Sequence, residues 1–429
     1  MKLKNFGRAA LALAASAVMV LGMTSCTLGF TVGYLFVTGS ATGAGINNGQ
    51  IATYKIKNND GSLSLTNNIG SGGPNPTQVV VNSSGSYLYV LNAGLGTDAS
   101  PAIGQIDLFA IGGSGVVTHQ ATFNPKGSNT RNIVIDGNFL YALDGFAPGG
   151  SGPNGTQSIG DISAFAIDST TGRLTPVLNN QARDSNGLPL TYFPVGTNPT
   201  WLAVNASFAY IAEQGPASGA TPNPNDPPQA IFLYNQSATS GQLTLTQSTP
   251  TPTGATQLTY VYSTSTFLYA LDAGPPGSTG FILPYTVGSG GTLAAVPSGA
   301  RANNAQSQAP VGPSRILKET THNFLWVANS GINTNPGAGG NVITAYTIQA
   351  NGQLFDANTG GANGETAGSG TRAIVEDPSN QYVYAVNFND STITGKKVNQ
   401  QTGGLDSLVK AMPAPPTSPT WCATTGSTF

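Results

Sequence analysis

Three arginines are the residues of this chain best suited to chemistry. Arg131, Arg315 and Arg372 stand at the start of short apolar runs that recur along the sequence. Asp, Glu, Lys and Arg together make up only 8% of the residues, against about 25% in typical soluble domains. Guanidinium groups that converge would bind a carboxylate or phosphate in a bidentate manner. The alternative is structural: each arginine bridges neighbouring repeats by donating to loop carbonyls. Arg131 and Arg372 align with each other, whereas Arg315 is offset by one position, so a sideways orientation is open to it.

Glu213, in the run Ile211-Ala212-Glu213-Gln214, is a fourth candidate. Other repeats carry a shorter polar residue at the same place, namely Thr38, Asn92, Asp144, Asp272, Asn329 and Asn387. Short Asx side chains there usually cap the following turn. Glu is too long for an Asx turn, so Glu213 is either a reactive group or a surface or arginine-paired carboxylate.

Several common kinds of site are not expected. The two histidines, His119 and His322, lie far apart in the sequence, so no multi-histidine metal centre is predicted. The sequence contains no Gly-rich phosphate loop, Gly-x-Ser-x-Gly elbow or His-Glu-x-x-His motif, and no cofactor is predicted. A net charge of -2 provides no basic field to hold nucleic acid.

These candidates are embedded in a repeated pattern of an aromatic residue, an apolar residue, an aromatic or apolar residue and another apolar residue. Its copies begin at Tyr34, Tyr87, Phe139, Phe208, Phe267, Phe324 and Tyr382. An apolar run precedes most copies, an Ile-x-x-aromatic-x-Ile pattern follows many, and a Gly-Leu turn signal often closes the unit. Four short strands at a period of about 55 residues predict an all-β, seven-bladed β-propeller of four-stranded antiparallel blades.

Closure of the ring is also predicted. The first repeat begins at its second strand, Tyr34, with no inner strand before it. The C-terminal run Pro419-Thr420-Trp421-Cys422 resembles Pro199-Thr200-Trp201-Leu202, an inner strand of the fourth repeat. The C-terminal strand should therefore pair into blade one and complete a propeller over residues 34–429. Trp201 and Trp421 are expected to pack between blades rather than to form a sugar-stacking platform.

Loop length separates the two faces of this propeller. Long loops follow the second strands over 92–104, 144–160, 213–229 and 329–340, whereas the turns between the inner and second strands are short. The arginines at inner-strand entry and Glu213 at a second-strand end fall on the long-loop face. Long loops on a rigid scaffold are where binding and catalytic residues concentrate.

The N-terminus resembles a targeting segment. Lys2, Lys4 and Arg8 precede an apolar stretch over 9–21, and small residues lead to Cys26. Residues 1–25 are predicted to be a lipoprotein-type signal peptide, Cys26 the acylated residue and residues 26–33 a short linker. The protein would then be exported and anchored to the cell envelope, on the periplasmic or outer-membrane side if the cell has two membranes. An ordinary secretory signal is the alternative. Cys422 is expected to be a small buried hydrophobe, with a disulfide to Cys26 as the rival.

The repeats resemble a known family. Tyr382-Val383-Tyr384-Ala385-Val386-Asn387, followed by Ile393 and Thr402-Gly403-Gly404-Leu405, is similar to the YVTN-type repeat. The full set resembles the lactonase family of seven-bladed propellers, which includes propeller-type 6-phosphogluconolactonase. The resemblance implies lactone hydrolysis, with Glu213 as general base. It also implies a catalytic histidine at an inner-strand entry, and neither His119 nor His322 lies there.

Two functions follow from the sequence. One is hydrolysis of a lactone or cyclic ester on the long-loop face, where Arg131, Arg315 and Arg372 would bind an anionic group and polarise the carbonyl. The other is a non-catalytic surface propeller that binds protein or glycan through the same loops. We expect a monomer that touches the membrane only through its lipid anchor.

Overall fold

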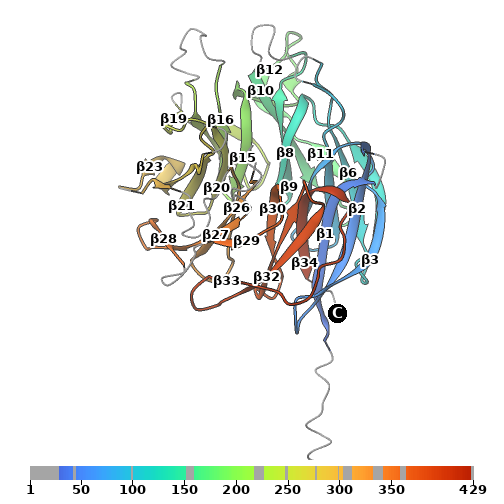
Figure 1. Ribbon diagram of the computed structural model, residues 1–429. Helices are drawn as coiled ribbons and strands as arrows, with labels where there is room; N and C mark the ends of the chain where they lie inside the picture. The colour runs from blue at the N-terminus through green and yellow to red at the C-terminus, as the bar shows by residue number, and fades with distance from the viewer. Residues whose placement is uncertain are drawn as a thin grey trace, which may run out of the picture.

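Seven antiparallel sheets surround a common axis in the computed structural model (Figure 1). The predicted seven-bladed propeller is therefore confirmed. The structure describes residues 29–41, 45–97, 100–150, 159–216, 227–246, 250–275, 278–297, 299–302, 312–331, 342–357 and 364–426. The predicted signal peptide, Cys26 and its lipidation lie outside these residues. None of the helical segments found within them is long and apolar enough to cross a membrane.

Each blade runs from an inner strand at the axis to an outer strand. Blade one contains β34 (Thr417–Gly426), β1 (Thr31–Ala41), β2 (Gly45–Lys57) and β3 (Leu63–Gly70). Blade two contains β4 (Pro76–Val81), β5 (Tyr87–Asn92), β6 (Gln105–Ile111) and β7 (Val117–Phe123). Blade three contains β8 (Ser128–Asp136), β9 (Phe139–Phe146), β10 (Ile159–Ile167) and β11 (Leu174–Pro176). Blade four contains β15 (Pro199–Asn205), β16 (Phe208–Glu213), β17 (Ala230–Gln236) and β18 (Leu243–Leu245).

The last three blades follow the same order. Blade five contains β20 (Leu258–Ser263), β21 (Phe267–Asp272), β22 (Phe281–Val287) and β23 (Leu293–Ala295), with the 3-10 turn η1 (Ser289–Gly291) between the last two. Blade six contains β25 (Pro313–Lys318), β26 (Phe324–Asn329), β27 (Val342–Ile348) and β28 (Leu354–Asp356). Blade seven contains β30 (Thr371–Glu376), β31 (Tyr382–Asn387), β32 (Thr392–Val398) and β33 (Leu405–Ser407).

Four blades carry a fifth short strand that the sequence pattern did not predict. These strands pair with the third strand of blades three to six and are β14 (Phe193–Thr197), β19 (Thr251–Pro252), β24 (Arg301–Ala302) and β29 (Gly364–Thr366). The fourth strands there are short and leave part of the third strand's edge unpaired, so the connection to the next blade covers that edge. A separate hairpin of β12 (Asn179–Arg183) and β13 (Pro189–Leu190) precedes β14.

The ring closes as the sequence predicts. The inner strands touch their neighbours in the order β34, β4, β8, β15, β20, β25 and β30, and β30 returns to β34. In Figure 1 the red β34 lies beside the blue β1. Their antiparallel register pairs Val37 with Cys422 and Thr38 with Trp421. β1 begins at Thr31, within the stretch predicted to be a linker. Cys422 is a free thiol buried in the core of this sheet, and its burial raises the thiol pKa.

The repeated aromatic pattern encodes the contact between blades. The third residue of the pattern donates to a glycine carbonyl in the outer turn of the following blade: Tyr89 Oη lies 2.6 Å from Gly172 O, and Trp326 Nε1 lies 2.8 Å from Gly403 O. Gly172 has φ of 69°, and a Cβ added there would lie 2.6 Å from the Tyr87 ring. Only glycine fits both demands, which explains why aromatic pattern and Gly-Leu turn recur together.

Candidate functional site

Strand register fixes where each candidate arginine lies. Arg131 and Arg372 each follow the inner-strand residue that pairs with the end of the second strand, as the pairs Thr130–Asp144 and Thr371–Asn387 show. In blade six Pro313 pairs with Asn329 at the end of the second strand. Ser314 therefore occupies the position that Arg131 and Arg372 hold in their blades, and Arg315 is one residue further along. Its offset by one position puts Arg315 level with Trp201 and Trp421. In blade five Thr259 occupies the arginine position.

The three arginines meet at one small cavity where the inner strands begin. Its volume is about 180 Å³, and its described lining consists of Thr77, Gln78, Arg131, Trp201, Arg315, Arg372, Thr420 and Trp421. This arginine mouth, as we call these eight residues, contains no carboxylate or imidazole. Convergence of the arginines is thus observed, and the cavity is strongly cationic.

Arg315 is the most confined of the three. Its guanidinium carbon lies 4.3 Å from the ring centre of Trp201, 4.7 Å from that of Trp421 and 5.3 Å from that of Tyr260. Burial lowers the pKa of Arg315 to about 10; nearby Tyr260 opposes the shift and the Arg372 charge adds to it. Nη1 donates to the Ser314 carbonyl at 2.5 Å, while buried Nε has no acceptor in the described part of the chain. Arg315 therefore stays charged at neutral pH without an acidic partner.

The other two arginines frame the opening. Arg372 is exposed, and its guanidinium carbon lies 3.7 Å from the ring centre of Phe388. Arg131 is half-buried in the same wall. Like charges so close raise the energy of the empty cavity, and an anion between them would lower it.

Glu213 is not brought into the arginine mouth. Its buried carboxylate accepts the Gly196 N–H at 2.9 Å. Asp144 accepts the Gly127 N–H at 3.1 Å and Asp272 accepts the Gln257 N–H at 2.8 Å in the corresponding places. Glu213 and Asp144 cap the segment that leads into their own inner strand. Asp272 caps that segment and also the turn that follows it, because it accepts the Gly274 N–H at 2.9 Å. A general-base role for Glu213 stays a prediction that this geometry does not support.

Trp201 and Trp421 pack between blades, as predicted, but their direct contact with each other was not predicted. Their rings stack with centres 5.6 Å apart and planes inclined by 22°. They belong to blades four and one, whose inner strands are not neighbours in the ring, so the stack crosses the central channel. Beyond it lies a second cavity of about 430 Å³ lined along the inner strands. The matching Pro-Thr-Trp runs are the available signal, and they predict packing between blades without showing which blades meet.

The family model described as "Lactonase, 7-bladed beta-propeller" matches residues 282–422, from β22 of blade five into β34. The predicted resemblance to the lactonase family is confirmed. No curated protein matches the sequence.

Three solved structures share the lactonase-like fold. A candidate 6-phosphogluconolactonase from Bacteroides uniformis has 13% identity and a TM-score of 0.65, covering 92% of this chain and 100% of its own. A protein from Lactobacillus plantarum has 15% identity and a TM-score of 0.64, covering 92% and 100%. The periplasmic gluconolactonase of Pseudomonas aeruginosa has 14% identity and a TM-score of 0.62, covering 92% and 99%. Identities this low establish the fold and leave the reaction open.

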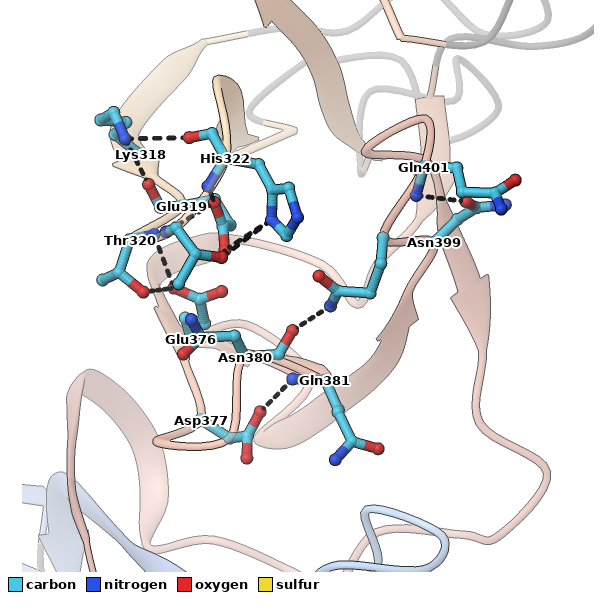
Figure 2. Close-up of polar contacts among 12 residues, drawn as sticks. Lys318, Glu319, Thr320, His322, Glu376, Asp377, Asn380, Gln381, Asn399 and Gln401 are labelled. Atoms are coloured by element: carbon cyan, nitrogen blue, oxygen red, sulfur yellow. Dashed lines mark hydrogen bonds and ion pairs between the residues drawn. The ribbon is translucent and has the colours of Figure 1, made fainter.

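A second polar cluster lies at the other end of the inner strands of this lactonase-like propeller (Figure 2). Buried Glu319 accepts the Thr321 N–H at 2.8 Å and faces His322 Nδ1 at 3.2 Å. Glu376 accepts the Thr320 N–H at 3.2 Å, and burial and the Glu319 charge raise the pKa of Glu376 to about 7. These carboxylates fix the short turns at the strand ends. No group of three or more His, Cys, Asp or Glu side chains suited to a metal is found among the described residues.

Proposed function

We propose that this lactonase-like propeller binds a small organic anion in the arginine mouth, and that its ligand is a lactone carrying a carboxylate or phosphate group. The observation that carries the proposal is the presence of three guanidinium groups around one small cavity with no acid in its described lining. A buried charge without a counter-ion lowers the stability of the folded protein by on the order of several kcal/mol. A bound anion would remove that cost while the cavity is occupied.

The geometry favours charge recognition over general acid–base chemistry. Arg315 cannot lose its proton near neutral pH. It would hold the acidic group together with Arg372, while Arg131 would face the lactone carbonyl. Hydroxide attacks that carbonyl carbon, a guanidinium stabilises the oxyanion, and the ring C–O bond then breaks as the leaving alkoxide takes a proton from water. Because the described lining has no base, hydroxide would be the attacking species above neutrality, and kcat/KM should rise steadily with pH.

The test is a comparison of two lactones that differ in charge. Hydrolysis of 6-phosphogluconolactone and of uncharged gluconolactone would be followed at constant pH by base uptake. We expect kcat/KM to favour the phosphorylated lactone by about 100-fold, from roughly 3 kcal/mol of charge-assisted hydrogen bonds. Arg315→Met should abolish that preference. Arg183→Met is the matched control, because Arg183 is exposed in the β12–β13 hairpin and donates to Gly187 O. Equal rates on both lactones would contradict the proposal.

Binding without turnover is the second candidate, favoured by the lack of carboxylate and imidazole in the described lining of the arginine mouth. The expected result is then tight binding of the anion by calorimetry with no increase over spontaneous lactone hydrolysis. Loop exchange on the long-loop face would separate a small ligand from a protein or glycan partner, since only the latter contacts the loops.

We also propose that the protein is exported and lipid-anchored at Cys26. The sequence before Cys26 supports this, as does the periplasmic location of the Pseudomonas aeruginosa gluconolactonase with the same fold. Metabolic labelling with a fatty acid should tag the protein, and Cys26→Ser should abolish the label. Labelling that survives the substitution would contradict the anchor.

A further inference from the structure

We infer that ring closure and anion binding are coupled through Trp421, a positioning residue that the C-terminal strand β34 holds against Arg315. The inference rests on the proposed anion binding in the arginine mouth and adds a regulatory consequence to it. The coupling arises because the strand that closes the ring also supplies part of the cavity wall.

β34 contributes two residues to the arginine mouth, Thr420 and Trp421. Thr420 Oγ1 donates to Pro76 O of blade two at 2.5 Å and lies 3.1 Å from Thr38 Oγ1 of β1. Trp421 pairs in register with Thr38. The cavity is therefore complete only while the two ends of the chain are joined in one sheet.

Trp421 acts on Arg315 through its ring. The guanidinium carbon lies 4.7 Å from the Trp421 centre and 4.3 Å from the Trp201 centre, while the two indoles stack on each other. A cation over the face of Trp is stabilised by the ring quadrupole, most strongly when it is desolvated. Three blades, one, four and six, thus meet in this single contact. Loss of Trp421 would free Arg315 to leave the position in which it faces the cavity.

Linkage makes the effect reciprocal. β34 pairs with β1 and shares core packing with it, and no covalent bond joins these two strands among the described residues, so β34 can open locally. An anion that binds only the closed ring stabilises closure by the factor 1 + [L]/Kd. Ligand occupancy should therefore protect β34 from opening more than it protects strands remote from the arginine mouth.

Hydrogen exchange tests this on the unmodified protein, with inorganic phosphate as the probe. At ten times the Kd measured by calorimetry, exchange of the β34 amides should slow by roughly tenfold. The comparison segment is β7, an outer strand of blade two, whose opening leaves the cavity intact; its exchange should not change. Equal slowing of β34 and β7, or no slowing at β34 at saturating phosphate, would overturn the coupling.

Substitutions of Trp421 distinguish a role in positioning Arg315 from a role in folding alone. Trp421→Leu should weaken phosphate binding about tenfold, and Trp421→Phe, which keeps a ring face, should restore affinity to within about threefold. Phosphate should change the tryptophan emission of the wild type. Trp326→Phe should keep that change, because Trp326 is buried in blade six and bonded to Gly403. Equal affinities in the Leu and Phe variants would overturn the role of Trp421.

The two hypotheses fail in different ways. If neither phosphate nor gluconate binds the wild type, the proposed function falls and takes the coupling with it. If phosphate binds and Arg315→Met abolishes binding, while Trp421→Leu binds as the wild type does, the anion site stands and the coupling alone is overturned.

Discussion

The arginine mouth and blade three both hold like charges close together, and they resolve the resulting repulsion in opposite ways. At the mouth, Arg315 and Arg372 share one cavity and have no acidic partner in the described part of the chain. In blade three, Asp144 and Asp161 face each other across β9 and β10 and are fully buried. Asp144 receives the Gly127 N–H and the Thr130 hydroxyl, whereas neither oxygen of Asp161 has a partner among the described residues.

The difference lies in what can neutralise each pair. Burial raises the pKa of both carboxyls, and the Asp144 charge raises that of Asp161 further. Asp161 can therefore hold a proton, which removes the repulsion between the two carboxyls. A guanidinium cannot discharge itself in this way near neutral pH. A raised pKa allows blade three to relieve its repulsion by holding a proton, whereas the arginines of the mouth have no such means. This contrast supports the proposed anion site.

Blade two shows a third solution at the equivalent strands. Asp107 is buried like the carboxyls of blade three, but donors surround it: Asn92 Nδ2 at 2.8 Å, Gln105 Nε2 at 2.7 Å, His119 Nε2 at 2.8 Å and Thr122 Oγ1 at 2.6 Å. An amide at the end of the second strand, in place of the Asp of blade three, removes the repulsion at its source. His119 is a satisfied structural residue in this setting.

The largest expected effect removes the anchor of blade three. Asp144→Ala leaves the buried Gly127 N–H and the Thr130 hydroxyl without the carboxylate that accepts from them. We expect the free energy of unfolding to fall by about 3 kcal/mol, measured by urea denaturation at pH 6. Asp144→Asn, which keeps one acceptor oxygen, should lose less. A loss below about 1 kcal/mol in Asp144→Ala would mean that the pair does not hold blade three together.

The second largest effect is expected when a carboxylate is introduced into the arginine mouth. Arg372→Glu places a carboxylate beside Arg315 and should weaken phosphate binding by at least about 100-fold, or 2.7 kcal/mol. Calorimetry with the Arg183→Glu variant as control distinguishes this local effect from the change in net charge. Unchanged affinity in Arg372→Glu would place the anion elsewhere and remove the basis for comparing the two regions.

The sequence predicts contacts between neighbouring blades well, and it predicts contacts between blades on opposite sides of the channel poorly. The blade number and the closing strand follow from the Tyr89-type aromatic pattern and the Gly172-type turn, because each repeat carries both halves of the contact with its neighbour. The meeting of Trp201 with Trp421 depends on ring geometry that brings non-neighbours across the channel. The contact of Glu213 with the Gly196 N–H recurs at Asp144 and Asp272, but it joins two separate segments of the chain, and the aromatic pattern does not show which segments meet.

Asp161→Asn tests the proton assigned to blade three. The folded-state pKa of Asp161 is raised above its unfolded value near 4, so the folded protein keeps a proton that the unfolded chain releases. Its contribution to stability is full below about pH 4 and declines as pH rises. The free energy of unfolding of the variant should therefore rise relative to that of the wild type with increasing pH, by about 2 kcal/mol at pH 8. Asp107→Asn is the matched control and should destabilise at both pH values. A difference in unfolding free energy between the variant and the wild type that is equal at pH 5 and pH 8 would exclude the proton assigned to Asp161.

The smallest expected effect concerns the stability of the mouth in the absence of an anion. Arg315→Met removes a confined charge repelled by Arg372 and keeps an apolar side chain against Trp201 and Trp421. We expect the free energy of unfolding to rise by about 1 kcal/mol in phosphate-free buffer, a shift of roughly 2 °C in Tm. Added phosphate should then raise the Tm of the wild type and leave that of the variant unchanged, while Arg183→Met behaves as the wild type in both buffers. A residue kept for binding is expected to cost stability when its ligand is absent. If Arg315→Met instead lowers the Tm in phosphate-free buffer, Arg315 is a structural bridge between blades, and the contrast between the mouth and blade three disappears.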